Sequence, residues 1–177
     1  VTATSANPGL VSDPIVIYNS ASSTGTLVFT SNPNQFGTSI ITVTVIDGGL
    51  DGDLSTTEDN ATTTTEFDVV VTAVNDKPTV NTLADTVISK NAPVQQPTFT
   101  GVTAGPNESQ PLLITASSSN PTLIPHPAVD YNSPETTGTI LYQPASGLTG
   151  QATVTLTVTD GGLDGDLNTT QDNESFT

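Results

Sequence analysis

Short runs of Val, Ile and Leu alternate with Thr along most of the chain. The clearest are IITVTVI at 40–46, EFDVVVTAV at 66–74, LLITASS at 112–118 and TVTLTVT at 153–159. Alternation with a period of two is typical of a strand with one buried face, and β-branched residues favour that backbone. Helical periodicity is not evident anywhere. The pattern therefore predicts an all-β protein.

The chain contains the same pattern twice. A shift of 113 positions aligns residues 1–64 with residues 114–177 without a gap, and 31 of the 64 aligned positions are identical. The best-matched stretches are two acidic loops, DGGLDGDLSTTEDN at 47–60 and DGGLDGDLNTTQDN at 160–173. Segments this similar should share one fold, so the repeat predicts tandem modules.

One full repeat can be followed from residue 77 onward. Strands are expected at 84–90, 97–103, 112–118, 128–132, 138–142 and 151–159, followed by a closing strand like that at 63–74 of the first copy. About seven short antiparallel strands in about 100 residues, with turn residues between them, predict a two-sheet sandwich. We expect a first module over 1–76 and a second over 77–177. Pro78 should make their linker short and stiff.

Each module is expected to be incomplete. Residues 1–4 correspond to the strand at 114–117, so the first module lacks what precedes it, and the second lacks a counterpart of EFDVVVTAV. Such modules have unpaired backbone groups and open edges. Either the termini are cuts in a longer tandem array, or a neighbouring identical chain supplies strands, by exchange or in a filament.

Charge adds a second theme. The chain has a formal net charge of −16 with two Lys and no Arg. Ten of its eighteen carboxylates lie in the two acidic loops or one residue beyond. Their mutual repulsion costs energy unless something neutralises it, which suggests a metal ion. The same charge excludes nucleic-acid binding, and no apolar run is long enough to cross a membrane.

Calcium is the metal that these residues favour, because it prefers carboxylate and carbonyl oxygens. The candidate ligands are Asp47, Asp51, Asp53 and Asp59 in the first loop, and Asp160, Asp164, Asp166 and Asp172 in the second. The second loop has part of an EF-hand spacing but lacks its Gly and its final Glu, and strands flank it. The alternative is a solvated acidic hairpin loop that keeps the protein soluble.

The chain resembles the cadherin-like and immunoglobulin-like tandem repeats of very large bacterial surface proteins, the adhesins. The resemblance lies in TVIDGG at 44–49, the returning strand at 65–74, the linker AVNDKP at 73–78 and the stretch 118–144. It implies immunoglobulin- or cadherin-like antiparallel β-sandwich modules, found extracellularly or at the cell surface, with Ca²⁺ at the module junctions.

The resemblance also implies ligands for these ions. Asn75 and Asp76 would act from the linker, with Glu108 and Asp160 at the top of the following module, and Asp47 would serve the junction before the first module. The linker VNDKP departs from the usual NDNxP, and the DxD and DRE motifs are missing, which favours one ion per junction or none. Asn75 and Asp76 could instead form a simple turn before Pro78, and Glu108 could be an exposed loop carboxylate.

The sequence thus favours a structural repeat of a long extracellular protein or fibre, stiffened by Ca²⁺, whose partners are neighbouring modules. The alternative is an adhesive or carbohydrate-binding module with a glycan or cell-surface partner. An enzyme is not expected, because nothing orients a nucleophile or general acid near isolated carboxylates such as Asp130 and Glu135. His126 lies between two prolines with no acidic neighbour in sequence. The repeated aromatics at Tyr18, Phe29, Tyr131 and Tyr142 are expected in the core or in cross-strand pairs.

Overall fold

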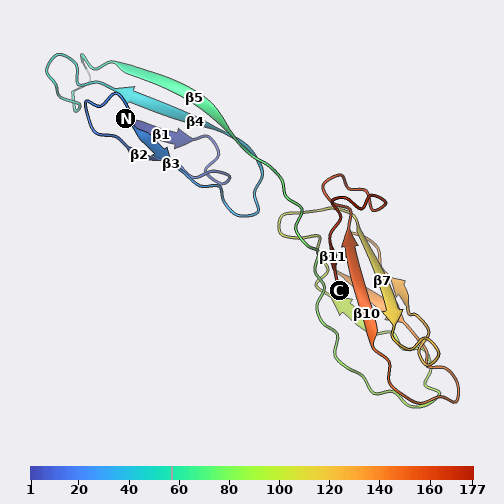
Figure 1. The fold of residues 1–177 in the computed structure, drawn as a ribbon. Coiled ribbons are helices and arrows are strands. Elements are labelled where there is room, and N and C mark those ends of the chain that lie inside the picture. Colours follow the sequence, from blue (N-terminus) through green and yellow to red (C-terminus); the bar gives the residue numbers. More distant parts are fainter. Residues whose placement is uncertain (57) are drawn as a thin grey trace. The chain divides into compact units, whose positions relative to one another are not determined.

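The computed structural model describes residues 1–56 and 58–177. Its strands pair antiparallel and form an all-β, sandwich-type fold, which confirms the predicted fold class (Figure 1). The chain divides into two compact units, Val1–Ala73 and Val74–Thr177. The division falls after Ala73 rather than after residue 76, so the linker residues Asn75 and Asp76 belong to unit 2. In the described part of the chain, no helix has the length and apolar character needed to cross a membrane.

Unit 1 consists of a three-stranded sheet and a two-stranded sheet. Its strands are β1 (Thr2–Ser5), β2 (Ile15–Ile17), β3 (Thr26–Val28), β4 (Gly37–Ile46) and β5 (Thr62–Val71). The sheets have the orders β1-β4-β5 and β2-β3. Leu10, Val11 and Ile41 form the buried core, with Val69 and Val71 of β5 packed against it.

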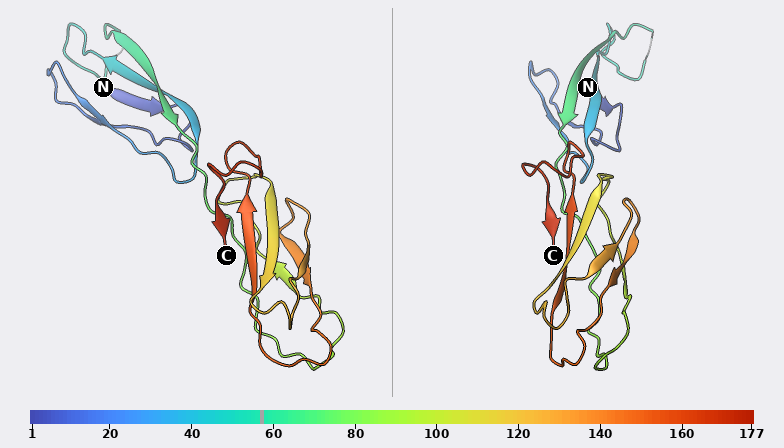
Figure 2. Two further views of the ribbon diagram at one scale, coloured as in Figure 1. Left: turned by 45° about the vertical axis from the view of Figure 1, so that its right-hand side comes forward. Right: turned by 90° about the vertical axis from the view of Figure 1, so that its right-hand side faces the viewer.

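Unit 2 has two three-stranded sheets. Its strands are β6 (Thr98–Thr100), β7 (Leu112–Ser118), β8 (Ala128–Asp130), β9 (Thr137–Leu141), β10 (Val154–Asp160) and β11 (Ser175–Phe176). The sheets have the orders β11-β10-β7 and β6-β9-β8. Figure 2 shows β10 and β11 on one side of the unit, with the orange strands β8 and β9 on the other.

The alternating positions of both sheets meet in the core of unit 2. Phe99 of β6 and Ile140 of β9 pack with Ile114 of β7 and Val158 of β10. Phe99 needs a glycine opposite it: a Cβ atom at Gly138 would lie 2.3 Å from Cζ of its ring. Residues far apart in sequence thus bury the apolar face that the period-two pattern predicted.

The prediction of a strand over 84–90 is wrong, and the strand expected over 97–103 is reduced to β6. A strand needs a neighbour to satisfy its backbone groups. Here β10 pairs with β7 along its whole length, but with β11 only at Val158 and Thr159. The segment 83–90 instead anchors Leu83 in the core and leaves Val87 fully exposed. The count of about seven strands per module stays a prediction.

Candidate functional site

Each acidic loop closes a β-hairpin, and its first aspartate ties the two ends together. Asp47 Oδ1 accepts hydrogen bonds from the backbone N–H groups of Gly49 and Ala61, at 3.1 and 2.9 Å. Asp160 Oδ1 accepts the equivalent bonds from Gly162 and Glu174, both at 2.9 Å. The two loops therefore begin with the same local structure.

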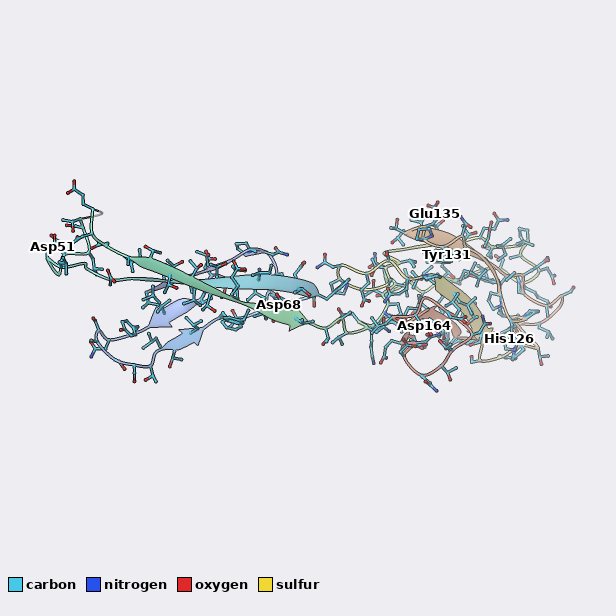
Figure 3. The ribbon with its side chains drawn as sticks, turned by 90° about the horizontal axis from the view of Figure 1, so that it is seen from above. Asp51, Asp68, His126, Tyr131, Glu135 and Asp164 are labelled. Atoms are coloured by element: carbon cyan, nitrogen blue, oxygen red, sulfur yellow. The ribbon has the colours of Figure 1, made fainter. Side chains whose placement is uncertain are left out.

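The inner carboxylates also bond to backbone amides. In the first loop, Asp51 accepts from the N–H of Asp53, Asp53 from that of Ser55, and Asp59 from that of Leu50, at 2.7 to 2.9 Å. In the second loop, Asp164, Asp166 and Asp172 accept from the N–H groups of Asp166, Asn168 and Leu163, at 2.8 to 2.9 Å. These contacts are Asx turns and loop closures of the kind that short acidic side chains form. Figure 3 shows Asp51 and Asp164 in the two loops.

The loop glycines are fixed by the same geometry. Gly49 and Gly162 have φ angles of +58° and +60°, which favour glycine. A Cβ atom at Gly49 would also lie 2.4 Å from Cγ of Asp59, and one at Gly162 would lie 2.6 Å from Cγ of Asp172. Much of the match between the loops thus follows from a hairpin that bonds to itself.

The amide contacts also stabilise the negative charge of the loop carboxylates. They hold the pKa of Asp47 below its ordinary value, through the N–H of Ala61 first and then that of Gly49. The pKa values of Asp53 and Asp166 are lowered by the backbone N–H and then the side chain of the residue two positions on. Counting cationic side chains alone missed these donors. The D-G-D-L-S/N spacing is the signal for them, because an aspartate commonly bonds to the backbone two residues on.

A different environment surrounds Asp160. Its side chain is completely buried, whereas its repeat counterpart Asp47 is exposed. The linker residue Asn75 donates through Nδ2 to Asp160 Oδ1 at 3.1 Å and to the backbone carbonyl of Asp172 at 2.8 Å. Gln110 donates through Nε2 to Asn75 Oδ1 at 2.7 Å. The first residues of unit 2 are thereby hydrogen-bonded to the acidic loop of the same unit, at 160–173.

Glu108 joins the same end of unit 2 through Asp76. The backbone N–H of Asp76 donates to Glu108 Oε1 at 3.0 Å. Gly105 makes this approach possible, since a Cβ atom there would lie 2.5 Å from Glu108 Oε2 and 2.9 Å from Asp76 Cβ. Glu108 is thus a partner of the linker.

Among the described residues, four side chains of unit 2 that belong to the linker-contacting segments or to the second acidic loop have a buried oxygen atom without a hydrogen-bond partner. These atoms are Asp160 Oδ2, Glu108 Oε2, Gln110 Oε1 and Asn173 Oδ1. The three donors to Asp160 are neutral, so its buried charge has no cationic partner among them. Buried acceptors of this kind are costly unless something compensates them, and oxygen-only donor sets suit Ca²⁺.

Carboxylates alone do not complete such a site. Within residues 1–56 and 58–177, no group of three His, Cys, Asp or Glu side chains is placed to hold a metal ion. Amide and carbonyl oxygens would have to supply the remaining ligands. The structure places Asn75 against Asp160, and Asn75 in turn contacts Gln110 and the carbonyl of Asp172. Asn173 of the same loop has a buried oxygen without a partner.

The structure joins Asn75 to Asp160 and to the carbonyl of Asp172, and it joins Asp76 to Glu108 through a separate hydrogen bond. Asp164 and Asp166 lie within the same loop and bond to its backbone. Asp47, Asp51, Asp53 and Asp59 lie in the hairpin of unit 1, and all eleven assignments as metal ligands stay predictions. Sequence reasoning missed Gln110 and Asn173, because neutral amides do not stand out in a search for charge.

The other singled-out side chains have structural contacts. His126 is exposed, and its Nδ1 accepts a hydrogen bond from the backbone N–H of Ser118 at 3.0 Å. Tyr131 and Tyr142 pack against the core of unit 2, and Phe29 packs against that of unit 1. The expectation of a core or cross-strand position is wrong for Tyr18, which is exposed and donates a local hydrogen bond to the carbonyl of Ser22 at 3.2 Å.

Comparison of the chain with protein-family models, with curated proteins and with solved structures found no match.

Proposed function

We propose that this chain is a structural repeat of a long extracellular surface protein or fibre, and that Ca²⁺ bound beside Asp160 stiffens the connection between its units. The observation that carries this proposal is the buried Asp160 carboxylate, which has only neutral donors on one oxygen and no partner on the other. The 113-residue repeat supports the structural role, because tandem modules of one fold build extended proteins.

The residues that would hold the ion are Asp160, Glu108, Asn75 and Asn173, with the carbonyl of Asp172. Calcium would compensate the buried charge and supply a partner for the buried acceptors. Unit 1 ends at Ala73, two residues before Asn75. An ion bound to Asn75 would therefore order the residues that lead from one unit to the next.

The stabilisation of the folded state by calcium depends on the ratio of the free calcium concentration to the dissociation constant. Extracellular modules bind calcium with dissociation constants of about 10⁻⁴ to 10⁻³ M. At 10 mM free calcium the folded state would gain about 1.4 to 2.7 kcal/mol. For a unit of about 100 residues, this raises the melting temperature by roughly 6 to 20 °C.

The test compares thermal unfolding in 10 mM calcium and in chelator for the natural chain, Asp160→Asn and Asp47→Asn. Asp160→Asn should lose the gain, while Asp47→Asn, the exposed counterpart, should keep it. Asp160→Asn should not lower stability in chelator, because it removes a buried charge. Equal midpoints in calcium and chelator for the natural chain would refute calcium binding. A gain lost only in Asp47→Asn would place the ion in unit 1.

Stiffening needs its own measurement. The chain has no cysteine, so Ser23→Cys and Thr136→Cys, at exposed positions of units 1 and 2, provide two labelling sites. The distribution of distances between two spin labels should narrow in calcium. An unchanged distribution alongside a raised melting temperature would mean that calcium stabilises unit 2 without stiffening the connection.

A further inference from the structure

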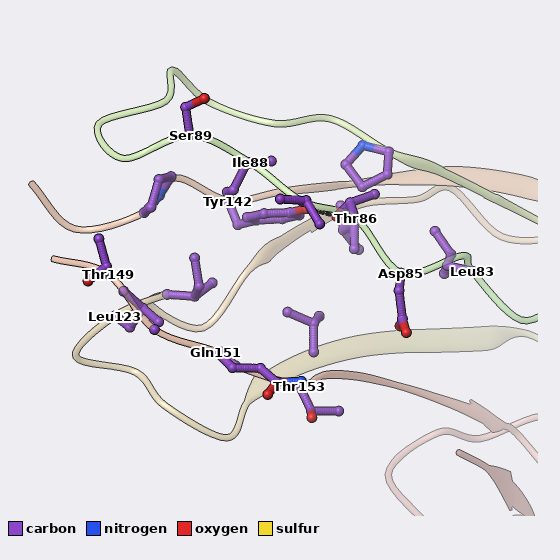
Figure 4. Close-up of a pocket in the computed structure, with 18 of the residues that line it drawn as sticks. Leu83, Asp85, Thr86, Ile88, Ser89, Leu123, Tyr142, Thr149, Gln151 and Thr153 are labelled. Atoms are coloured by element: carbon purple, nitrogen blue, oxygen red, sulfur yellow. Dashed lines mark hydrogen bonds between the residues drawn. The ribbon is translucent and has the colours of Figure 1, made fainter.

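A cleft of about 660 Å³ opens in unit 2 between the segment 83–90 and the residues leading into β10. Figure 4 shows Ile88 and Ser89 on one side, with Gln151 and Thr153 on the other. Its apolar lining includes Leu123, Ile124, Ile140, Tyr142, Val154 and Leu156. The cleft is thus an opening into the hydrophobic core and lies apart from the acidic end of the unit.

The repeat identifies what covers the corresponding surface in unit 1. The shift of 113 positions matches Leu10, Val11, Phe29, Ile41 and Val43 to the cleft residues Leu123, Ile124, Tyr142, Val154 and Leu156. In unit 1 those residues form or adjoin the core, and Val69 and Val71 of β5 pack against them. Phe67 of β5 lies beside Phe29, with ring centroids 6.3 Å apart.

The strand register leads to the same place. On β4, Phe67 pairs with Ile41, Val69 with Ser39 and Val71 with Gly37. The repeat counterparts of Gly37–Ile41 are residues 150–154, all of which line the cleft.

The pairing of β11 supports the correspondence. Phe176 pairs with Val158 in the register in which Thr63 pairs with Val45 in unit 1. A strand that continued this ladder antiparallel to β10 would run along Thr157 to Val154 and then enter the cleft. At about 3.3 Å per residue, five residues would cover about 16 Å of the cleft edge.

We propose that this cleft is the acceptor groove for one extended polypeptide strand of the β5 type, paired antiparallel with residues 150–157. Every second side chain of that strand is apolar, as at Phe67, Val69 and Val71, and the two aliphatic ones pack against the core. The aromatic one lies against Tyr142, as Phe67 lies against Phe29. The strand would also lie next to the segment 83–90. Without it, Thr86 of this segment is joined to the hydroxyl of Tyr142 by a hydrogen bond of 3.4 Å. This inference rests on the repeat and does not depend on calcium.

The first experiment appends TEFDVVVTAV, the sequence of residues 65–74, after Thr177 of the full chain, where the repeat places it. The matched control appends the same ten residues with Ser in place of the Phe and of the first and third Val. The melting temperature of unit 2 should rise by roughly 5 to 10 °C relative to the control. Backbone amides of residues 150–157 should gain protection from hydrogen exchange. Equal melting temperatures and equal protection would overturn the proposal.

The second experiment adds a peptide of residues 62–74 to the isotope-labelled full chain and follows backbone amide NMR signals. Shifts confined to residues 150–157 and the cleft lining, absent with the Ser-substituted peptide, support the groove with a strand supplied in trans. A gain from the appended strand without binding of the free peptide supports a strand supplied within the chain. Shifts that are identical for both peptides would overturn the side-chain assignment. Both experiments are run in chelator, so that failure of calcium binding leaves their outcome unchanged.

Discussion

Replacing Gly138 by Ala places a methyl group where the ring of Phe99 already lies. The new Cβ would be 2.3 Å from Cζ of the ring and 2.9 Å from the backbone oxygen of Asp130. Carbon atoms in contact normally lie about 3.5 to 4.0 Å apart, so the ring would have to move by more than about 1 Å. Phe99 is 1% exposed and has core residues on its other sides. The carbonyl of Asp130 opposes relief by a backbone shift.

Overpacking of this kind typically costs about 1 to 3 kcal/mol, and we expect Gly138→Ala near the upper end of that range. The melting temperature of unit 2 should then fall by roughly 10 to 20 °C. The repeat supplies a matched control in Gly25, the counterpart of Gly138 in unit 1. A Cβ atom there meets nothing closer than 3.2 Å, so Gly25→Ala should cost less than about 1 kcal/mol.

The assay is urea unfolding, with hydrogen exchange to assign each transition to its unit. A double-mutant cycle with Phe99→Leu tests the cause, because leucine has no atom at the position of Cζ. The cost of Gly138→Ala should fall by at least half in that background. The reasoning is refuted if Gly25→Ala costs as much as Gly138→Ala, or if Phe99→Leu leaves the cost unchanged.

Three further predictions concern the loops and the core of unit 1. Gly162→Ala forces a side chain into a left-handed backbone and against the Asp172 carboxylate, so it should lower the stability of unit 2 by about 1 to 3 kcal/mol in urea unfolding. The control is Gly147→Ala, which should cost less, because the φ angle there is also positive but a Cβ atom has no neighbour within 4 Å. Ser39→Ala removes a buried hydroxyl that is hydrogen-bonded to Ser5 Oγ at 2.8 Å and to the backbone N–H of Asn7 at 3.0 Å. It should lower the free energy of unfolding of unit 1 by about 1 to 3 kcal/mol in the same assay, and a loss below about 0.5 kcal/mol would contradict this account. Ser55→Ala removes one of the two groups that lower the pKa of Asp53, so an NMR titration should find that pKa raised toward 3.8, with Asp166 unchanged as the control.

The lowered pKa values of these aspartates also make the stability of the fold depend on pH. A carboxylate whose pKa is lower in the folded than in the unfolded protein stabilises the fold above the unfolded value of about 3.9. That contribution is lost as the pH falls through the lowered folded value. The amide contacts of Asp47, Asp53 and Asp166 should therefore support the two loops at neutral pH and weaken below about pH 4.

Local pattern was sufficient for much of the fold. Period-two alternation at 112–118 predicted β7, and the repeat placed equivalent hairpins in both units. It failed at 84–90, where apolar residues are present but the segment is not part of any of the described sheets. Strand formation depends on the partner strand as well as on the segment's own residues. A sequence pattern cannot supply that partner.

The candidate site was partly predictable for a related reason. Carboxylates are conspicuous in a chain with so few cations, so the acidic loops drew attention to Asp160, whereas Glu108 was singled out by the family resemblance. Their environments depend on long-range contacts: Asn75 reaches Asp160 across 85 positions, and Asp76 reaches Glu108 across 32. The local sequence around Gln110 gives no sign that its side chain bonds to Asn75.

Asp47 and Asp160 show what the repeat leaves undetermined. Both follow an alternating strand, both begin the sequence DGGLDGDL, and both accept two backbone N–H groups that close a hairpin. Only Asp160 receives Asn75 and becomes fully buried. The loops share most of their sequence and local hydrogen bonds, so we expect a difference in calcium affinity between these two aspartates to come from the linker and the residues that contact it, Glu108 and Gln110. The pair of substitutions at Asp47 and Asp160 therefore separates a property of the loop from a property of its junction.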